Sequence, residues 1–332
     1  MIFNSLITFS STGGFKGTIL SIMLVLTAVG CFLVGVNLMS KGLVKATMKE
    51  NSFFTRGFAS KNRLGGIGSG ILYTVVTQSS DVTAVTLVRL ADLGIITLFQ
   101  ACACIIGANI GTTVTSFIVS LSSFELTPYF AFLAFVGAIP LLSKKKNWKI
   151  FGEIVAGFGV LFIGLQLLDS NVENEDFRNF VSTVFNFTEN PFLLILIGAA
   201  LTAVMQSSSV VTAIVVFLIS GAFFPLKNAF CLVAGANIGT CFTSWIAAFG
   251  SSKTARQTAF FHTMYNIIGT TLFLAVMLSP IEGSFLTFAE GLNIPAEFKV
   301  ALFHLTFNVC AAVIVVPLLR PLVWFSSKVV RH

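Results

Sequence analysis

Charge is the scarcest property of this sequence, because Asp, Glu, Lys and Arg together make up only 10% of its 332 residues. Soluble domains carry about 25% charged residues, so the shortfall excludes an ordinary water-soluble protein. The mean hydropathy is +0.93, and apolar segments of roughly 20 residues, long enough for a helix to cross a bilayer, recur along the chain. These segments lack the alternation of transmembrane strands. We therefore predict an all-α integral membrane protein.

The sequence also lacks the motifs of several functional classes. Its six cysteines lie within apolar segments and in no metal-binding spacing with its three histidines, so we expect no metal centre and no cofactor. Neither the Gly-x-Ser-x-Gly turn of hydrolases nor the His-Glu-x-x-His run of zinc proteases occurs. An intramembrane hydrolase that pairs Ser207 or Ser208 with His262 is a remote alternative, and we predict that the protein is not an enzyme. No basic stretch precedes the first apolar run, which argues against a signal peptide.

The net charge of +7 comes from basic residues in short loops, which set membrane orientation and do not indicate nucleic-acid binding. If residues 64–93 and 191–220 each enter and leave the membrane on one side, the basic loops all fall on one face. Those loops are 41–63, 144–149, 253–256 and the C-terminus, and the acidic loops 169–190 and 281–297 fall on the other face. We therefore predict two re-entrant helical hairpins and about seven full crossings, which begin near residues 18, 95, 128, 150, 223, 258 and 300. The N-terminus is expected outside and the C-terminus in the cytoplasm, in the plasma (inner) membrane.

Two polar runs in the apolar sequence are repeated at one spacing. Gln78-Ser79-Ser80 precedes a Gly-Ala-Asn-Ile-Gly-Thr run at residues 107–112, and Gln206-Ser207-Ser208-Ser209 precedes the same run at residues 235–240. With a shift of 128, residues 70–118 and 198–246 share 20 identities in 49 pairs, which indicates an internal repeat. Units 1–146 and 147–332 start three crossings apart, so the second is inverted relative to the first. Inverted repeats are typical of secondary transporters, with the binding site near the membrane midplane.

The serine runs are predicted to form the tips of the two hairpins and to face each other. Free backbone N–H groups at a helix N-terminus attract anions, and serine is a favoured N-cap. The tips therefore suit a small tetrahedral oxyanion, held by Ser79, Ser80, Ser207, Ser208 and Ser209.

The two Gly-Ala-Asn-Ile-Gly-Thr runs are predicted to supply oxygen ligands for a sodium ion. Glycine costs a helix about 1 kcal/mol relative to alanine, so we expect local unwinding that turns carbonyls inward beside Asn109, Thr112, Asn237 and Thr240. The alternative is that the small residues let helices pack closely.

Asp81 stands where the second run has Ser209. A carboxylate at membrane depth is costly and usually functional. Asp81 is predicted to ligate sodium, to carry a coupled proton, to repel a second anionic charge, or to cap the helix that follows the tip. A smaller echo, Phe261-His262 to Asn266 and Phe303-His304 to Asn308, is expected to pack helices together, or else to gate transport or relay protons.

On these paired motifs and the late Phe-His-x-x-x-Asn segments, the sequence resembles the type II sodium–phosphate cotransporter family over about residues 18–322. The resemblance implies sodium-driven symport of inorganic phosphate, and it adds Gln78 and Gln206 to the substrate and ion sites. Asp81 departs from the family's serine, and no soluble C-terminal domain follows, as expected of a short member or a shortened chain.

Phosphate, sodium ions and membrane lipid are the expected partners, with a homodimer as an option. Transport of another oxyanion, phosphate export, proton coupling through Asp81 and a channel are the alternatives.

Overall fold

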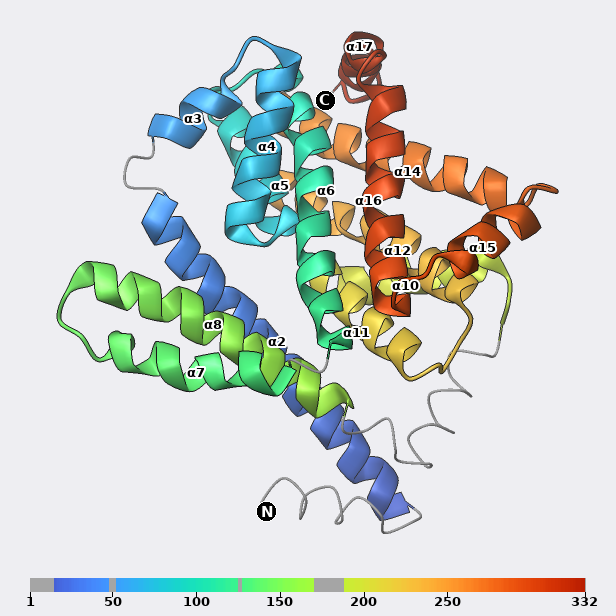
Figure 1. Cartoon of the computed structure of the whole chain (residues 1–332). Helices are drawn as coiled ribbons and strands as arrows, with labels where there is room; N and C mark the ends of the chain where they lie inside the picture. Colours follow the sequence, from blue (N-terminus) through green and yellow to red (C-terminus); the bar gives the residue numbers. More distant parts are fainter. Residues whose placement is uncertain (1–14, 48–51, 125–126, 170–187, 332) are drawn as a thin grey trace.

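Figure 1 shows a computed structural model of the chain, in which residues 15–47, 52–124, 127–169 and 188–331 are described. Within those ranges every regular element is helical, as predicted. The elements are α2 (Phe15–Thr47), α3 (Ser52–Phe58), α4 (Arg63–Thr77), α5 (Ser80–Asp92), α6 (Leu98–Ser120), the short helix η1 (Leu121–Ser123), α7 (Thr127–Leu141), α8 (Lys146–Asp169), α10 (Pro191–Met205), α11 (Ser208–Ser220), α12 (Leu226–Gly239), α13 (Cys241–Ala248), α14 (Lys253–Met277), α15 (Glu282–Gly291), α16 (Ala296–Val315) and α17 (Leu319–Val329). The predicted acidic loop 169–190 lies almost wholly outside the described residues.

Six helical stretches in the described part of the chain are long and apolar enough to cross a membrane. They are Ile22–Ala46, Leu98–Ser123, Lys146–Leu168, Leu226–Ala248, Lys253–Met277 and Ala296–Val315. Large apolar side chains such as Leu26, Phe135 and Val313 are exposed on the helices, as expected of surfaces that face lipid.

Six of the seven predicted crossings correspond to these long helices, and the seventh corresponds to a shorter apolar helix. The crossing expected to begin near residue 128 is α7, which has 15 residues. A helix of that length extends about 22 Å, short of the roughly 30 Å hydrocarbon core. The helix ends directly after Pro140, and the basic run from Lys144 to Lys146 follows. An interior proline breaks the backbone hydrogen-bond ladder, which explains the early end.

The two segments predicted as hairpins form two pairs of short helices with matching turns. The first pair is α4 and α5, and the second is α10 and α11, with 15 and 13 residues in each pair. Gln78 (φ 52°, ψ 25°) and Gln206 (φ 51°, ψ 32°) end the first helix of each pair in the left-handed region. The serine that follows each glutamine is extended, with φ of −152° at Ser79 and −158° at Ser207. The repeated sequence therefore builds the same tight turn twice.

The Gly-Ala-Asn-Ile-Gly-Thr runs are helical, so the predicted unwinding is wrong. Helix α6 continues through residues 107–112, and at Thr240 the backbone keeps helical angles between α12 and α13. The glycines serve close packing, because a Cβ atom on Gly107 would lie 1.9 Å from the Ile67 carbonyl oxygen of α4. A Cβ on Gly235 would lie 2.0 Å from the Ile195 carbonyl oxygen of α10. Each run thus lets the first helix of a hairpin lie directly against a long helix.

Helices α2 and α8 pack on each other through glycines in a reciprocal way. A Cβ on Gly35 would meet the backbone nitrogen of Leu161 at 2.3 Å, and one on Gly164 would meet that of Phe32 at 2.6 Å. Phe32 and Leu161 occupy corresponding places in the two repeats, as do Gly35 and Gly164, so the contact relates the repeats as a local two-fold would. Figure 1 shows α2, α7 and α8 together, to one side of the other helices.

The second helix of each hairpin packs on both repeats. Helix α5 lies against α6 of its own repeat and against α13 and α14 of the other, whereas α11 lies against α12 and α16 of its own repeat and against α6 of the other. At the far end of α5, the Ser252 backbone N–H donates to Asp92 at 2.6 Å, and this bond lowers the pKa of the Asp92 carboxyl. These contacts place Asp81, at the tip of the first hairpin, beside Thr243 of α13.

Candidate functional site

The serines at the two tips cap the helices that follow them. The Ser79 hydroxyl accepts the backbone N–H of Val82 at 3.2 Å, and the Ser207 hydroxyl accepts that of Val210 at 3.4 Å. The predicted N-cap role is therefore confirmed at both tips. Ser80 and Ser208 are the first residues of α5 and α11, and both are buried, whereas Ser209 is half-buried.

The two glutamines before the serines are not equivalent. Gln78 is buried, accepts the Thr115 hydroxyl at 3.1 Å and donates to its own helix at Val75. Gln206, its partner in the repeat, is exposed. The sequence predicted the same roles for both, and the structure separates them because Thr243, which corresponds to Thr115, has a different partner.

That different partner is Asp81. The Thr243 hydroxyl lies 2.9 Å from the Asp81 carboxylate, and the backbone N–H of Ser208 also approaches it. Asp81 is only 8% exposed. Its side chain joins the tip of the first hairpin to α13 and to the tip of the second, so residues 162 positions apart meet here.

Of the four sodium ligands predicted in the Gly-Ala-Asn-Ile-Gly-Thr runs, three donate to backbone carbonyls of their own helical segment and one contacts a tip serine. The amide nitrogens of Asn109 and Asn237 bond to Ile105 and Val233 of their own helices, at 2.9 and 3.1 Å. Thr112 accepts the Ser80 hydroxyl at 3.3 Å, which joins a predicted phosphate residue to a predicted sodium residue.

Thr240 donates to the carbonyl of Asn237 at 2.6 Å. Thr112 is thus the one of the four with a hydrogen bond to a tip among those found in the described residues, and the helices that carry them stay intact.

Two buried serine–histidine pairs hold the long helices together at matching places. Ser116 lies 2.7 Å from Nδ1 of His304, and Ser244 lies 2.7 Å from Nδ1 of His262. Ser116 and Ser244 correspond in the repeat. A histidine of α16 therefore bonds to α6 in the same way as a histidine of α14 bonds to α13. His262 is therefore paired with Ser244 and not with Ser207 or Ser208, which argues against the hydrolase alternative.

Sequence reasoning missed Asn266 and Asn308 as candidates for the site. Both side chains are fully buried, and each has an amide oxygen with no hydrogen-bond partner among the described residues. The Asn266 amide donates to the Asn237 carbonyl at 2.8 Å, and His304 Nε2 lies 3.3 Å from Asn237 Oδ1. The late echo, Phe-His-x-x-x-Asn, was the signal that could have found them. A buried oxygen without a donor is a position at which a cation gains a ligand.

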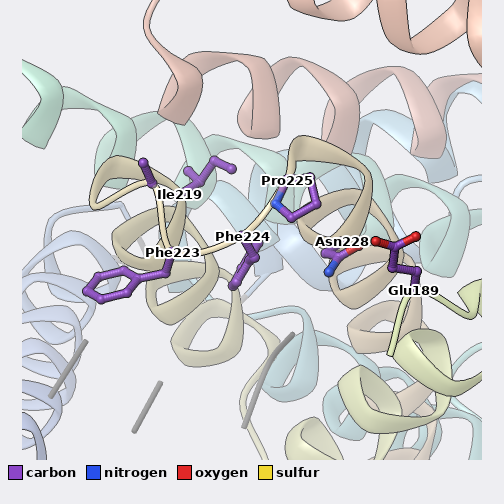
Figure 2. Close-up of a pocket in the computed structure, with 7 residues that line it drawn as sticks. Glu189, Ile219, Phe223, Phe224, Pro225 and Asn228 are labelled. Carbon is purple, nitrogen blue, oxygen red and sulfur yellow. The ribbon is translucent and has the colours of Figure 1, made fainter. Parts of the chain in front are cut away.

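A pocket of about 540 Å³ lies away from the tips, at the other end of α11 (Figure 2). Figure 2 shows the Asn228 amide beside the Glu189 carboxylate at one end of this pocket. Both amide atoms of Asn228 lack hydrogen-bond partners in the described chain. Its partner in the repeat, Gln100, forms a capping box with Thr97. Pro225 replaces that threonine in the second unit. Proline lacks both the backbone N–H and the hydroxyl that the capping box uses, so Asn228 has no such partner.

Comparison of the sequence with known proteins identifies a family that it matches. A family model described as Na+/Pi-cotransporter matches residues 31–170 and 168–289. The "Uncharacterized protein YqeW" of Bacillus subtilis (strain 168) is 27% identical over 290 residues, which cover 86% of this chain and 91% of that protein. The "Putative inorganic phosphate export protein YjbB" of Escherichia coli (strain K12) is 23% identical over 317 residues, covering 94% of this chain.

The match spans only 56% of the length of the E. coli relative. The "Sodium-dependent phosphate transport protein 2B" of Rattus norvegicus is 34% identical over 122 residues, or 35% of this chain and 17% of that protein. No solved structure matches the chain.

Proposed function

The chain belongs to the Na+/Pi-cotransporter family, and from this premise we propose that it moves inorganic phosphate across the cytoplasmic membrane by sodium-coupled symport. Phosphate binds between the two hairpin tips, and sodium binds among the polar side chains of the neighbouring long helices. The observation that carries the proposal is a pair of tips with one geometry in an apolar helical protein, where Asp81 of the first tip bonds to Thr243 of the second repeat.

Phosphate suits the tips because their free groups are donors. Helices α5 and α11 both begin at the tips, so the positive ends of two helix dipoles converge there. The hydroxyls of Ser80 and Ser208 add buried donors at the first position of each helix. The three ion pairs found in the described chain, Lys45–Glu153, Arg89–Asp92 and Lys227–Glu282, lie away from Ser80 and Ser208. The donors at the tips are hydroxyls, backbone amides and helix ends.

Sodium coupling is supported by the amide oxygens of Asn266 and Asn308, which are unpaired in the described chain. Asn266 donates to the Asn237 carbonyl, and Asn308 lies one turn after His304 on α16. A hard cation takes oxygen ligands, and a side-chain oxygen that lacks a donor in the protein gains one partner from the ion. The predicted ligands Asn109, Thr112, Asn237 and Thr240 therefore contribute side-chain oxygens from intact helices and not unwound carbonyls.

Alternating access follows from the repeat. Units 1–146 and 147–332 are inverted copies, and the two hairpins are re-entrant, entering from the cytoplasm and from outside respectively. The reciprocal glycine contacts of α2 and α8 and the matching turns at Gln78 and Gln206 support this two-fold relation. Movement of the hairpin-bearing helices against α2, α7 and α8 then opens the tips to one side at a time.

Uptake of radiolabelled phosphate into proteoliposomes tests the proposal. An inward sodium gradient is expected to drive accumulation, whereas an equal potassium gradient is not. Ser208→Ala is expected to weaken phosphate uptake, and Ser220→Ala is the matched control because Ser220 lies at the far end of α11 and donates to the Phe217 carbonyl. Uptake that ignores sodium, or equal loss in both variants, would refute the proposal.

The second candidate is phosphate export, which the printed name of the E. coli relative suggests for that protein. Efflux from phosphate-loaded vesicles under an opposed sodium gradient separates it from uptake. Competition by sulfate and arsenate measures selectivity among oxyanions.

A further inference from the structure

The Asp81 carboxylate lies in a group of hydrogen-bond donors. The Thr243 hydroxyl lies 2.9 Å away, and the backbone N–H groups of Ser208 and of Asp81 itself also face it. Ser208 is the first residue of α11, so the carboxylate sits at the positive end of the second hairpin's helix. The first hairpin thus places an anion beside donors of α13 and of the second hairpin.

This environment does not fit a sodium ligand. A sodium ion needs oxygens with free lone pairs around it, whereas the groups around this carboxylate present hydrogens. Those hydrogens are what the oxygens of a tetrahedral oxyanion would accept. The site around Asp81 is therefore an anion site that already contains an anion from the same chain.

We propose that Asp81 is a tethered competitor of the substrate. The carboxylate occupies the Ser208 and Thr243 donors when phosphate is absent, and phosphate must displace it to bind between the tips. This inference rests on the proposed function and adds a residue that sets affinity and links the two tips in the empty transporter. Only the first repeat carries the competitor, because Ser209 takes its place in the second.

The surrounding structure can lose the carboxylate without losing the fold. The Thr243 hydroxyl has a second acceptor, the Thr240 carbonyl at 2.7 Å. Helix α5 keeps its cap, because Ser79 and not Asp81 accepts the Val82 N–H. Serine at position 81 would also copy the second tip.

The test compares Asp81→Ser, Asp81→Asn and Asp81→Glu in sodium-driven phosphate uptake. Asp81→Ser and Asp81→Asn are expected to lower the KM for phosphate about tenfold or more, the affinity equivalent of a hydrogen bond to a charged group. Asp81→Glu keeps the anion and is expected to keep the wild-type KM. Glu290→Gln, on exposed α15, removes one negative charge far from the tips and serves as the charge control.

Binding is measured as well, from the phosphate-dependent rise in melting temperature of the purified protein, so a variant that binds but does not transport still gives a result. A larger rise at low phosphate is expected for Asp81→Ser. An unchanged or higher phosphate KM together with an unchanged thermal response would overturn the inference. A higher half-saturating sodium concentration at constant phosphate KM would also overturn it, because that result marks a cation ligand. Wild-type protein that neither takes up phosphate nor responds to it thermally would instead refute the proposed function itself.

Discussion

The close contact between α4 and α6 gives the sharpest prediction about this fold. Gly107 faces the Ile67 carbonyl, and an alanine Cβ there would lie 1.9 Å from that oxygen and 2.9 Å from the Ile71 nitrogen. Ordinary contacts of a Cβ begin at 3.4 Å. Both neighbours are backbone atoms, which cannot swing aside as a side chain does, so Gly107→Ala must push the two helices apart.

The magnitude follows from two opposed terms. Overpacking of this kind costs about 1–3 kcal/mol, and the better helix propensity of alanine returns at most about 1 kcal/mol. The net loss is about 1–2 kcal/mol, which corresponds to a fall in melting temperature of several degrees, at roughly 2–4 °C per kcal/mol. Gly235→Ala, with its Cβ 2.0 Å from the Ile195 oxygen, should lose as much because it is the same contact in the second repeat.

Thermal unfolding of the detergent-purified variants measures the effect. Gly68→Ala is the matched control, since Gly68 lies on the outer face of α4 with nothing within 4 Å of a Cβ. Gly111→Ala should fall between them, because its nearest atom is 2.8 Å away. Equal melting temperatures for Gly107→Ala and Gly68→Ala would refute the packing role. If Gly107→Ala melted normally but needed more sodium for activation, the result would instead favour the sodium site with unwound helices.

Three further predictions concern the tips and the buried polar groups. Gln206→Gly should raise the free energy of unfolding by up to about 1 kcal/mol, because glycine adopts the left-handed conformation freely. Gln78→Gly should lower it, because the Thr115 hydrogen bond is lost. A higher melting temperature for Gln78→Gly than for Gln206→Gly would contradict this. Ser116→Ala should lower the free energy of unfolding by about 1–3 kcal/mol, because it leaves a ring nitrogen of buried His304 without its partner. Ser116→Thr keeps the hydroxyl and should recover most of that stability. Asn266→Leu should raise the sodium concentration for half-maximal phosphate uptake about tenfold or more, since a charge-assisted oxygen ligand is lost; unchanged sodium activation would remove Asn266 from the proposed ion site.

Local features of the site could be predicted from the sequence because they depend on neighbours along the chain. The serine after each glutamine was expected to cap a helix, and Ser79 and Ser207 do so. A cap needs only the residue and the N–H groups two or three positions later, so its geometry is contained in a short segment.

The role of the glycine-rich runs could not be predicted in this way. Helix propensity alone favoured unwinding at residues 107–112, but burial of a flat glycine surface against α4 outweighs the roughly 1 kcal/mol that each glycine costs. Whether a glycine marks a break or a contact depends on what lies across from it, and Ile67 is 40 residues away in the chain.

The sequence by itself determined the class of this protein, its duplication and its two capped tips, since the scarcity of charge, the repeat of 128 residues and the serine caps are all properties of composition or short range. Only the tertiary structure decided that Gln78 is buried while Gln206 is exposed, and that Asp81 meets Thr243 and Ser208. The physical reason is that the second helix of each hairpin also packs on the other repeat, α5 on α13 and α14 and α11 on α6. A one-residue difference between the repeats therefore goes with different partners for Thr115 and Thr243, and a side chain's partner is set by packing that no local pattern encodes.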